Sequence, residues 1–159
     1  MQPIRSKALP KRNEIDDRFK WKLENIYAED EEWEKDFHKV KELSLEIQKF
    51  KGTLEKSGDN LLNCLKLRDR LLSLGDKLLV YARMRRDEDN TNPVYQALTD
   101  RATALYVSLY AAISFIKPEI IAIDERVLND FFNKINGLQV YKHFIDDILR
   151  QKQHTLSQK

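Results

Sequence analysis

One short stretch of the chain carries oxygen-bearing side chains at the spacing of a calcium-binding loop. Asp87, Asp89 and Thr91 occupy alternate positions within the sequence DEDNTN. A calcium loop of this kind also needs a glycine at its sharp turn and a bidentate glutamate near its end. Asn92 and Leu98 stand at those two positions. We therefore interpret the stretch as a solvated turn and not as a calcium site.

The histidines give little support for any other metal site. His38 and Glu42 are four residues apart, so on a helix they would share a face and could contact one metal ion. A zinc site normally takes at least three protein ligands. His143 and His154 are accompanied by no carboxylate in a suitable pattern. We expect His38 to be exposed, and we assign no metal ligand to this chain.

Nucleophilic catalysis has no support in the sequence either. The chain contains no G-x-S-x-G motif and no glycine-rich phosphate loop. Cys64 lies among leucines, where a cysteine is most simply a small apolar core residue. Tyr106 and Tyr110 have helical spacing and could line a peptide groove, but such tyrosines more often border a core. No catalytic or cofactor-binding residue is assigned.

The elements that would position these residues are helices, because composition and periodicity favour an all-α fold. Only four glycines and four prolines occur among 159 residues, and no stretch alternates with a period of two. Three helices are expected: from the cap Asp30 to near Gly52, from Asp59 through RMRR, and from the cap Asn92 to a stop at Pro118. The last two should form a long antiparallel hairpin on which the first helix packs. Gly75 would mark a close helix crossing.

We divide the chain into three parts. Residues 1–12 contain two prolines and no periodic apolar pattern, which predicts a flexible arm. Residues 13–117 are the expected N-terminal helical domain, with a short docking segment before its first helix. Residues 118–159 begin a second helical unit, in which Asp124 caps one helix and Gly137 interrupts before another. Near the chain end, Ser157 is suited to cap another helix, which favours a truncated unit.

Charge and cysteine usage limit the partners and the compartment. The 28 basic and 26 acidic residues nearly cancel, so no overall field would attract nucleic acid, and the basic arm alone would bind it weakly. No apolar run approaches the roughly 20 residues that span a bilayer. The single cysteine excludes an internal disulfide and fits a reducing compartment. We expect a cytoplasmic protein without a nucleic-acid or membrane partner.

Several stretches together resemble the N-terminal region of oligoendopeptidase F, within the thimet-oligopeptidase-like zinc metallopeptidases. They are LPKRNEID (residues 9–16), FKWKLENIYAEDEEWEKDF (19–37), DEDNTNPVYQAL (87–98), FIKPEI (115–120) and YKHFIDDILRQKQHTLS (141–157). Each stretch alone would be a weak match. Their order and spacing carry the resemblance, which covers nearly the whole chain.

The resemblance implies a parent enzyme that cuts oligopeptides in the cytoplasm. Its catalytic domain, far downstream, would carry an H-E-x-x-H helix whose two histidines bind zinc and whose glutamate activates water. This chain contains no such motif, so no catalytic residue is carried over and zinc is expected only in the full-length enzyme. The segment would form one wall of a substrate cavity too narrow for folded proteins. Its partners would be the catalytic domain of the same polypeptide and, through it, oligopeptides.

A free-standing helical interaction module is the alternative function. It would bind a partner through the apolar face of the second unit, and the reading frame beyond Lys159 would distinguish the two. Residues 127–149 contain more large apolar side chains than two short helices can bury against each other. We therefore expect self-association through residues 138–149, or disorder of that segment, while residues 59–117 stay folded.

Overall fold

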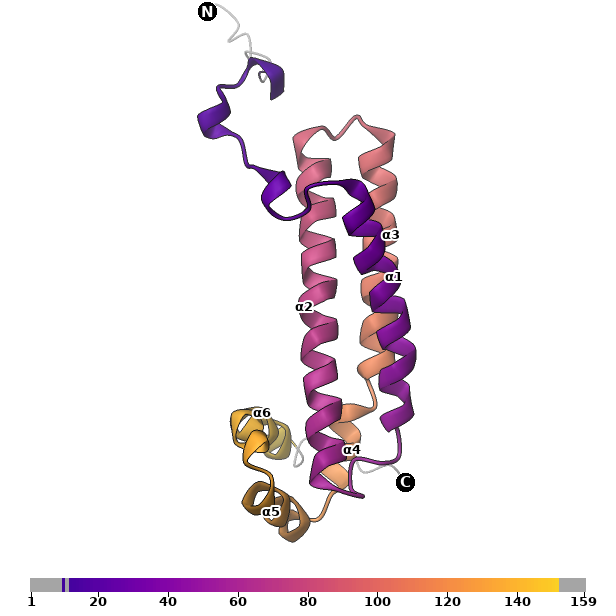
Figure 1. Ribbon diagram of the computed structural model, residues 1–159, viewed down its shortest axis with the longest axis vertical. Coiled ribbons are helices and arrows are strands. Elements are labelled where there is room, and N and C mark those ends of the chain that lie inside the picture. Colours follow the sequence, from indigo (N-terminus) through magenta and orange to yellow (C-terminus); the bar gives the residue numbers. More distant parts are fainter. Residues whose placement is uncertain (1–9, 11, 152–159) are drawn as a thin grey trace, which may run out of the picture.

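The described part of the chain is helical and forms a long hairpin with a third helix along it. The computed structural model describes residue 10 and residues 12–151, and no strand occurs among them. Helix α2 (Gly58–Glu88) and helix α3 (Pro93–Ile113) run antiparallel, and α1 (Asp30–Ile47) packs along both (Figure 1). This arrangement confirms the all-α prediction. The expectations for residues 1–9 and 11 and for Ser157 lie outside the described residues.

Helix α1 buries one apolar stripe and begins one residue after Glu29. Its buried side chains recur at helical spacing: Trp33, Phe37, Val40, Leu43 and Ile47. We predicted Asp30 as the cap, but Glu29 holds that position without a side-chain bond, and Asp30 is the first helical residue. The Glu32 carboxylate accepts a hydrogen bond from the Ala28 amide at 3.1 Å instead. The helix passes into a 3-10 turn, η4 (Gln48–Phe50), and the chain reverses at Gly52, where φ is +74°.

Helix α2 begins at Gly58 and not at Asp59 as predicted. The hydroxyl of Ser57 accepts a hydrogen bond from the Asn60 amide at 3.1 Å and caps the helix. Asp59 lies in the first turn, where its negative charge interacts favourably with the positive end of the helix dipole. Ser57 and Asp59, the two candidate caps, lie on either side of Gly58. The extended backbone of Ser57 identifies it as the cap.

The crossing of α2 and α3 is close at Gly75. A Cβ atom placed on Gly75 would lie 2.8 Å from Leu109 Cδ1, so the predicted close approach is confirmed. Farther up the hairpin, the Thr99 hydroxyl donates to the Ala82 carbonyl oxygen at 3.0 Å. At its first turn α3 is capped as predicted, because Asn92 Oδ1 accepts from the Val94 amide at 2.9 Å.

Pro118 does not end α3, which corrects the predicted stop. Helix α3 ends at Ile113, and a short helix, α4 (Ile116–Ala122), follows after a two-residue turn. Pro118 is the third residue of α4, where a missing amide hydrogen costs no intrahelical bond. The domain boundary that we place after residue 117 falls inside α4, and the division into domains stays a prediction.

The second unit covers its apolar side chains within the same chain. Helix α5 (Glu125–Lys134), capped by Asp124 as predicted, leads through η5 (Asn136–Tyr141) to α6 (Lys142–Arg150). In Figure 1 these helices lie beside the first turns of α2, and α5 and η5 contact α2 while α6 contacts α4. Three large side chains of the segment are buried: Leu138, Ile145 and Ile148. The expected disorder of residues 138–149 is therefore not seen, and most of the apolar side chains from which we expected self-association are covered, whereas Val140 is 83% exposed.

Two glycines allow this packing. A Cβ atom on Gly58 would lie 2.8 Å from Ile135 Cγ1, and one on Gly137 would lie 2.8 Å from Leu62 Cδ2. Both positions bring the second unit against the start of α2 at distances that larger residues would not permit. The predicted interruption at Gly137 is confirmed as a 3-10 turn between α5 and α6.

One helical stretch is long and apolar enough to span a membrane, which the sequence analysis did not expect. It runs through α3 and α4, from Pro93 to Ala122, with a mean hydropathy of 1.4 in its most apolar window, of which 28% is buried. Core helices of water-soluble proteins meet the same criterion when they are mostly buried, whereas most of this window is not. The stretch is also interrupted by the turn between Ile113 and Ile116.

Candidate functional site

The turn between α2 and α3 uses its oxygen atoms internally. Asp89 Oδ1 accepts hydrogen bonds from the Thr91 hydroxyl at 2.6 Å and from the Thr91 amide at 2.9 Å. These bonds lower the pKa of the Asp89 carboxyl. Asp87 is exposed and pairs with Arg86, the Nη2 to Oδ1 distance being 3.2 Å. These oxygens form hydrogen bonds and an ion pair within the turn, which agrees with a structural role.

Beside this turn lies a cavity of about 900 Å³ with charges of both signs. The segment before α1 forms one wall with Arg12 and Glu24, and the hairpin forms the other with Arg85, Glu88 and Tyr95. The Glu88 side chain, only 7% exposed, pairs with Arg12 and with Arg85, the latter at 3.5 Å between Nη1 and Oε2. Two cations thus compensate one buried carboxylate. The cluster attaches the N-terminal segment to the hairpin tip.

Sequence reasoning recognised only part of this cluster. Arg85 and Glu88 lie at the end of the helix that we expected from Asp59 through RMRR, and they pair there. Sequence reasoning missed Arg12, because an arginine in an aperiodic stretch gives no sign of a partner 76 positions along the chain (88 − 12).

Neither described histidine belongs to a cluster of metal-binding side chains. His38 is exposed on α1, as expected, and Glu42 accepts from Lys39 Nζ at 3.0 Å. His143 is exposed on α6. His154 lies outside the described residues. Within residues 10 and 12–151, no group of three or more His, Cys, Asp or Glu side chains could hold a metal ion. The described residues therefore do not fit the zinc of the implied parent enzyme, and we derive no step through it.

Cys64 is a core residue, as predicted. It lies fully buried on α2. Burial, and next the nearby Glu119 carboxylate, raise the pKa of the Cys64 thiol to about 12. The thiol is therefore protonated at neutral pH and shielded from reagents, which makes it unsuited to nucleophilic chemistry.

The two tyrosines border the core and adjoin a shallow groove. The Tyr106 hydroxyl donates to Asp76 Oδ1 at 2.7 Å and lies 3.3 Å from the Tyr110 hydroxyl. Hydrogen bonds with Tyr110 and then Asp76 raise the pKa of Tyr106. Tyr110, half exposed, lies at the rim of a groove of about 430 Å³. Leu72, Ile113 and Phe144 line this groove together with two cations, Arg68 and Lys117.

A larger uncharged surface lies on the outer side of α3. From Ala102 to Ile116 the sequence ATALYVSLYAAISFI contains no charged residue. Seven side chains there are exposed, on the side of the helix away from the buried stripe. The exposed Tyr110 and Ser114 adjoin the other five, which we call the α3 outer face: Thr103, Ala104, Val107, Ser108 and Ala111. Val107 is 65% exposed. We did not predict this face from the sequence, although the charge-free run could have indicated it.

Nearly the whole chain is similar in sequence to oligopeptidases. A family model described as oligopeptidase F matches residues 119–159. Oligopeptidase PepF of Bacillus subtilis is 37% identical over 98% of this chain, which spans 23% of that relative. The plasmid-encoded oligoendopeptidase F of Lactococcus lactis is 36% identical over 93% of the chain, which spans 25% of it. The chain thus spans about a quarter of the curated relatives that it matches.

Two solved structures share the fold. The crystal structure of oligoendopeptidase-F from Enterococcus faecium superposes with a TM-score of 0.73 at 30% identity, covering 80% of this chain and 25% of that protein. A protein from Chlamydophila abortus superposes over 92% of this chain with a TM-score of 0.76, at 21% identity. The second likeness concerns the fold alone. This chain therefore shares the arrangement of the α2–α3 hairpin and α1 with parts of both structures.

Proposed function

Since this chain is related to the N-terminal region of oligoendopeptidase F, we propose that it is the non-catalytic N-terminal segment of a zinc-dependent oligoendopeptidase. In this role it shapes the substrate cavity and restricts access to it. The observation that carries the proposal is the ratio of coverage: relatives named as oligopeptidases match 98% or 93% of this chain but only 23% or 25% of their own length. The hydrolytic machinery, including the zinc, is then supplied by the remaining polypeptide.

The shape of the segment supports a wall rather than a reaction centre. A stiff hairpin with 31 residues in α2 presents a long surface held by one continuous apolar core. A rigid surface of this kind can exclude folded proteins from a cavity while oligopeptides enter. We also propose the cytoplasm as its compartment, because a lone buried thiol suits reducing conditions.

The free-standing module remains the second candidate because of one observation. Leu138, Ile145 and Ile148 are buried within this chain, so these side chains of the second unit need no covering partner. A module that is complete by itself would show the same burial.

Fusion to a relative tests the proposal. This chain would replace the matched region of Bacillus subtilis oligopeptidase PepF, and cleavage of a quenched fluorogenic oligopeptide would be measured. The isolated chain should cleave nothing. The fusion protein should cleave the oligopeptide in a chelator-sensitive reaction, and it should leave the same sequence intact when it is placed in a loop of a folded protein.

Two outcomes would contradict the proposal. Chelator-sensitive cleavage by the isolated chain would place the chemistry in this segment. Equal activity and equal size preference in the relative's remainder alone, without any N-terminal segment, would show that no wall is needed.

A further inference from the structure

We propose that the α3 outer face is the surface on which the remaining polypeptide of the parent peptidase packs. This inference rests on the proposed function, since it presumes that a larger polypeptide surrounds the segment. It commits to one occupant, an uncharged helix face contributed by that polypeptide. Two properties of the face support it, its lack of charge and its satisfied hydroxyl groups. The greater length of the relatives supports it as well.

The lack of charge distinguishes the face from ordinary surface. Charged residues make up 34% of the chain, yet none occurs between Ala102 and Ile116, over about four helical turns. A helix whose outer side remains in water usually carries charged or polar residues there. Scattered exposed apolar side chains need no explanation, but a continuous uncharged strip along a helix indicates an interface.

The two hydroxyl groups of the face are already satisfied within α3. The Thr103 hydroxyl donates to the Thr99 carbonyl oxygen at 2.8 Å, and the Ser108 hydroxyl donates to the Ala104 carbonyl oxygen at 3.0 Å. Their hydrogens therefore point back into the helix and need no partner in water or across an interface. Ala104 and Ala111 add only methyl groups. A second helix can approach such a surface closely without burying an unsatisfied donor.

The length of the relatives identifies the occupant. This chain spans 23% of the Bacillus subtilis relative and 25% of the Enterococcus faecium structure, so most of each of those polypeptides lies outside the matched region. A lipid surface is less suitable, because the face has no basic cluster to attract anionic headgroups, although the half-exposed Tyr110 adjoins it. Arg101, at one end of the uncharged run, is instead held by Glu34 on α1.

Cysteine labelling tests the docking directly. Val107→Cys reports on the α3 outer face, and Leu45→Cys on α1 is a matched control, since Val107 and Leu45 are 65% and 70% exposed. Cys64 is buried with a raised thiol pKa, so a maleimide should modify only the introduced cysteine of this chain. In the isolated chain both cysteines should react at similar rates. In the fusion with the remainder of the Bacillus subtilis enzyme, labelling at position 107 should slow by about tenfold or more, with no change at position 45.

The outcomes separate this inference from the proposed function. Equal labelling at both positions in a fusion that cleaves oligopeptides overturns the docking surface and leaves the proposed function intact. Protection at position 107 in a fusion that cleaves nothing supports the docking surface and contradicts the proposed function. Protection of position 107 in the isolated chain by anionic phospholipid vesicles, or by raising the protein concentration, would assign the face to a membrane or to a second copy and overturn the inference.

A second measurement applies if the fusion does not fold. The isolated chain and the relative's remainder are then mixed as separate polypeptides and their association is measured by sedimentation. Ala111→Glu should leave the melting temperature of the isolated chain unchanged and should abolish association, whereas Leu45→Glu should leave association intact. Absence of association in the wild type, or association unaffected by Ala111→Glu, overturns the inference.

Discussion

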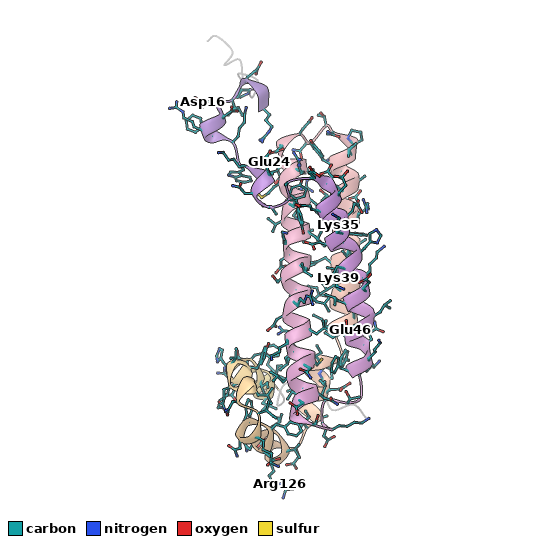
Figure 2. The ribbon with its side chains drawn as sticks, viewed as in Figure 1. Asp16, Glu24, Lys35, Lys39, Glu46 and Arg126 are labelled. Carbon is teal, nitrogen blue, oxygen red and sulfur yellow. The ribbon has the colours of Figure 1, made fainter. Side chains whose placement is uncertain are left out.

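Helices α1 and α3 bury similar apolar stripes in one bundle but differ on their outer sides. Lys35, Lys39 and Glu46, labelled along α1 in Figure 2, put charges of both signs on its solvent side, and Lys39 pairs with Glu42 at 3.0 Å. The α3 outer face carries no charge over a comparable length. Even the apolar Leu45 of α1 is isolated among charges. The inner stripe of a helix thus establishes the fold, and its outer side indicates whether water or another surface covers it.

The sharpest form of the comparison lies within α3. Leu109→Ala removes a fully buried side chain at the α2 crossing and should lower the free energy of unfolding by about 2–5 kcal/mol. Val107→Ala, two residues away on the outer face, should change it by less than about 0.5 kcal/mol. Urea denaturation of both variants measures the difference. A large loss for Val107→Ala would mean that the outer face is covered within this chain.

The α2 crossing offers a change whose sign depends on its neighbour. Gly75→Ala places a Cβ atom 2.8 Å from Leu109 Cδ1, an overlap that should cost about 1–3 kcal/mol. In a Leu109→Ala background the overlap disappears, and the better helix propensity of alanine should stabilise the protein by about 1 kcal/mol. A double-mutant cycle in urea tests this reversal. Stabilisation by Gly75→Ala in both backgrounds would show that the crossing is not tight.

Helices α3 and α1 should respond differently when their N-cap residues are replaced. Asn92→Ala removes the bond to the Val94 amide and should cost about 1 kcal/mol, whereas Glu29 makes no side-chain cap bond, so Glu29→Ala should cost little. Thermal unfolding followed by circular dichroism measures both. Millimolar calcium should leave the wild-type melting temperature unchanged, and a clear rise would restore the calcium interpretation of the turn.

The smallest expected effect concerns the ion pair that joins α1 to α3. Arg101 donates from Nη1 and Nη2 to the two carboxylate oxygens of Glu34, at 2.6 and 2.7 Å. These hydrogen bonds lower the pKa of Glu34 in the folded state. The contribution of ionised Glu34 to the free energy of unfolding is therefore present above the unfolded-state pKa of about 4.3. It is lost as the pH falls through the lower folded-state pKa.

Because both side chains are partly exposed, this contribution should be about 1 kcal/mol at most. The wild type should exceed Glu34→Gln in stability at pH 7, and the difference should shrink toward pH 3. Urea midpoints across this pH range provide the measurement. A stability difference that does not change with pH would mean that packing, and not the ion pair, causes it. The Arg101 guanidinium lies over the Trp33 and Phe37 rings, at 5.1 and 4.7 Å from their centroids.

Sequence periodicity predicted the helices well because each depends on local spacing. The stripe of α1, the Asn92 cap and the Gly75 crossing all follow from residues within a few turns of one another. The stop at Pro118 was wrong because proline forbids only the interior of a helix, and the sequence does not show that a new helix begins at Ile116.

Tertiary contacts explain the other differences. The apolar excess of residues 127–149 was correctly recognised, but its cover was not, because the approach of Gly58 to Ile135 depends on a fold between segments far apart in the sequence. The pairing of Arg12 with Glu88 is of the same kind. For the candidate site, the burial of Cys64 agrees with its interpretation as a core residue, and the absence of a calcium site at the turn stays a prediction. The charge-free run of α3 is visible in the sequence, but which of its side chains are exposed follows only from the packing of the helices.

The short turn at the hairpin tip has a consequence for the order of folding. Residues 89–92 alone separate α2 from α3, so these helices can pair outward from the turn at little cost in chain entropy. Docking of α1 must instead bring the Trp33 indole, which donates to the Leu78 carbonyl oxygen at 3.2 Å, across 45 positions of the sequence. Fluorescence of Trp33 should therefore report a later event than the gain of helix in α2 and α3. In a Trp21→Phe variant, which removes the exposed second indole, stopped-flow fluorescence should lag behind far-ultraviolet circular dichroism.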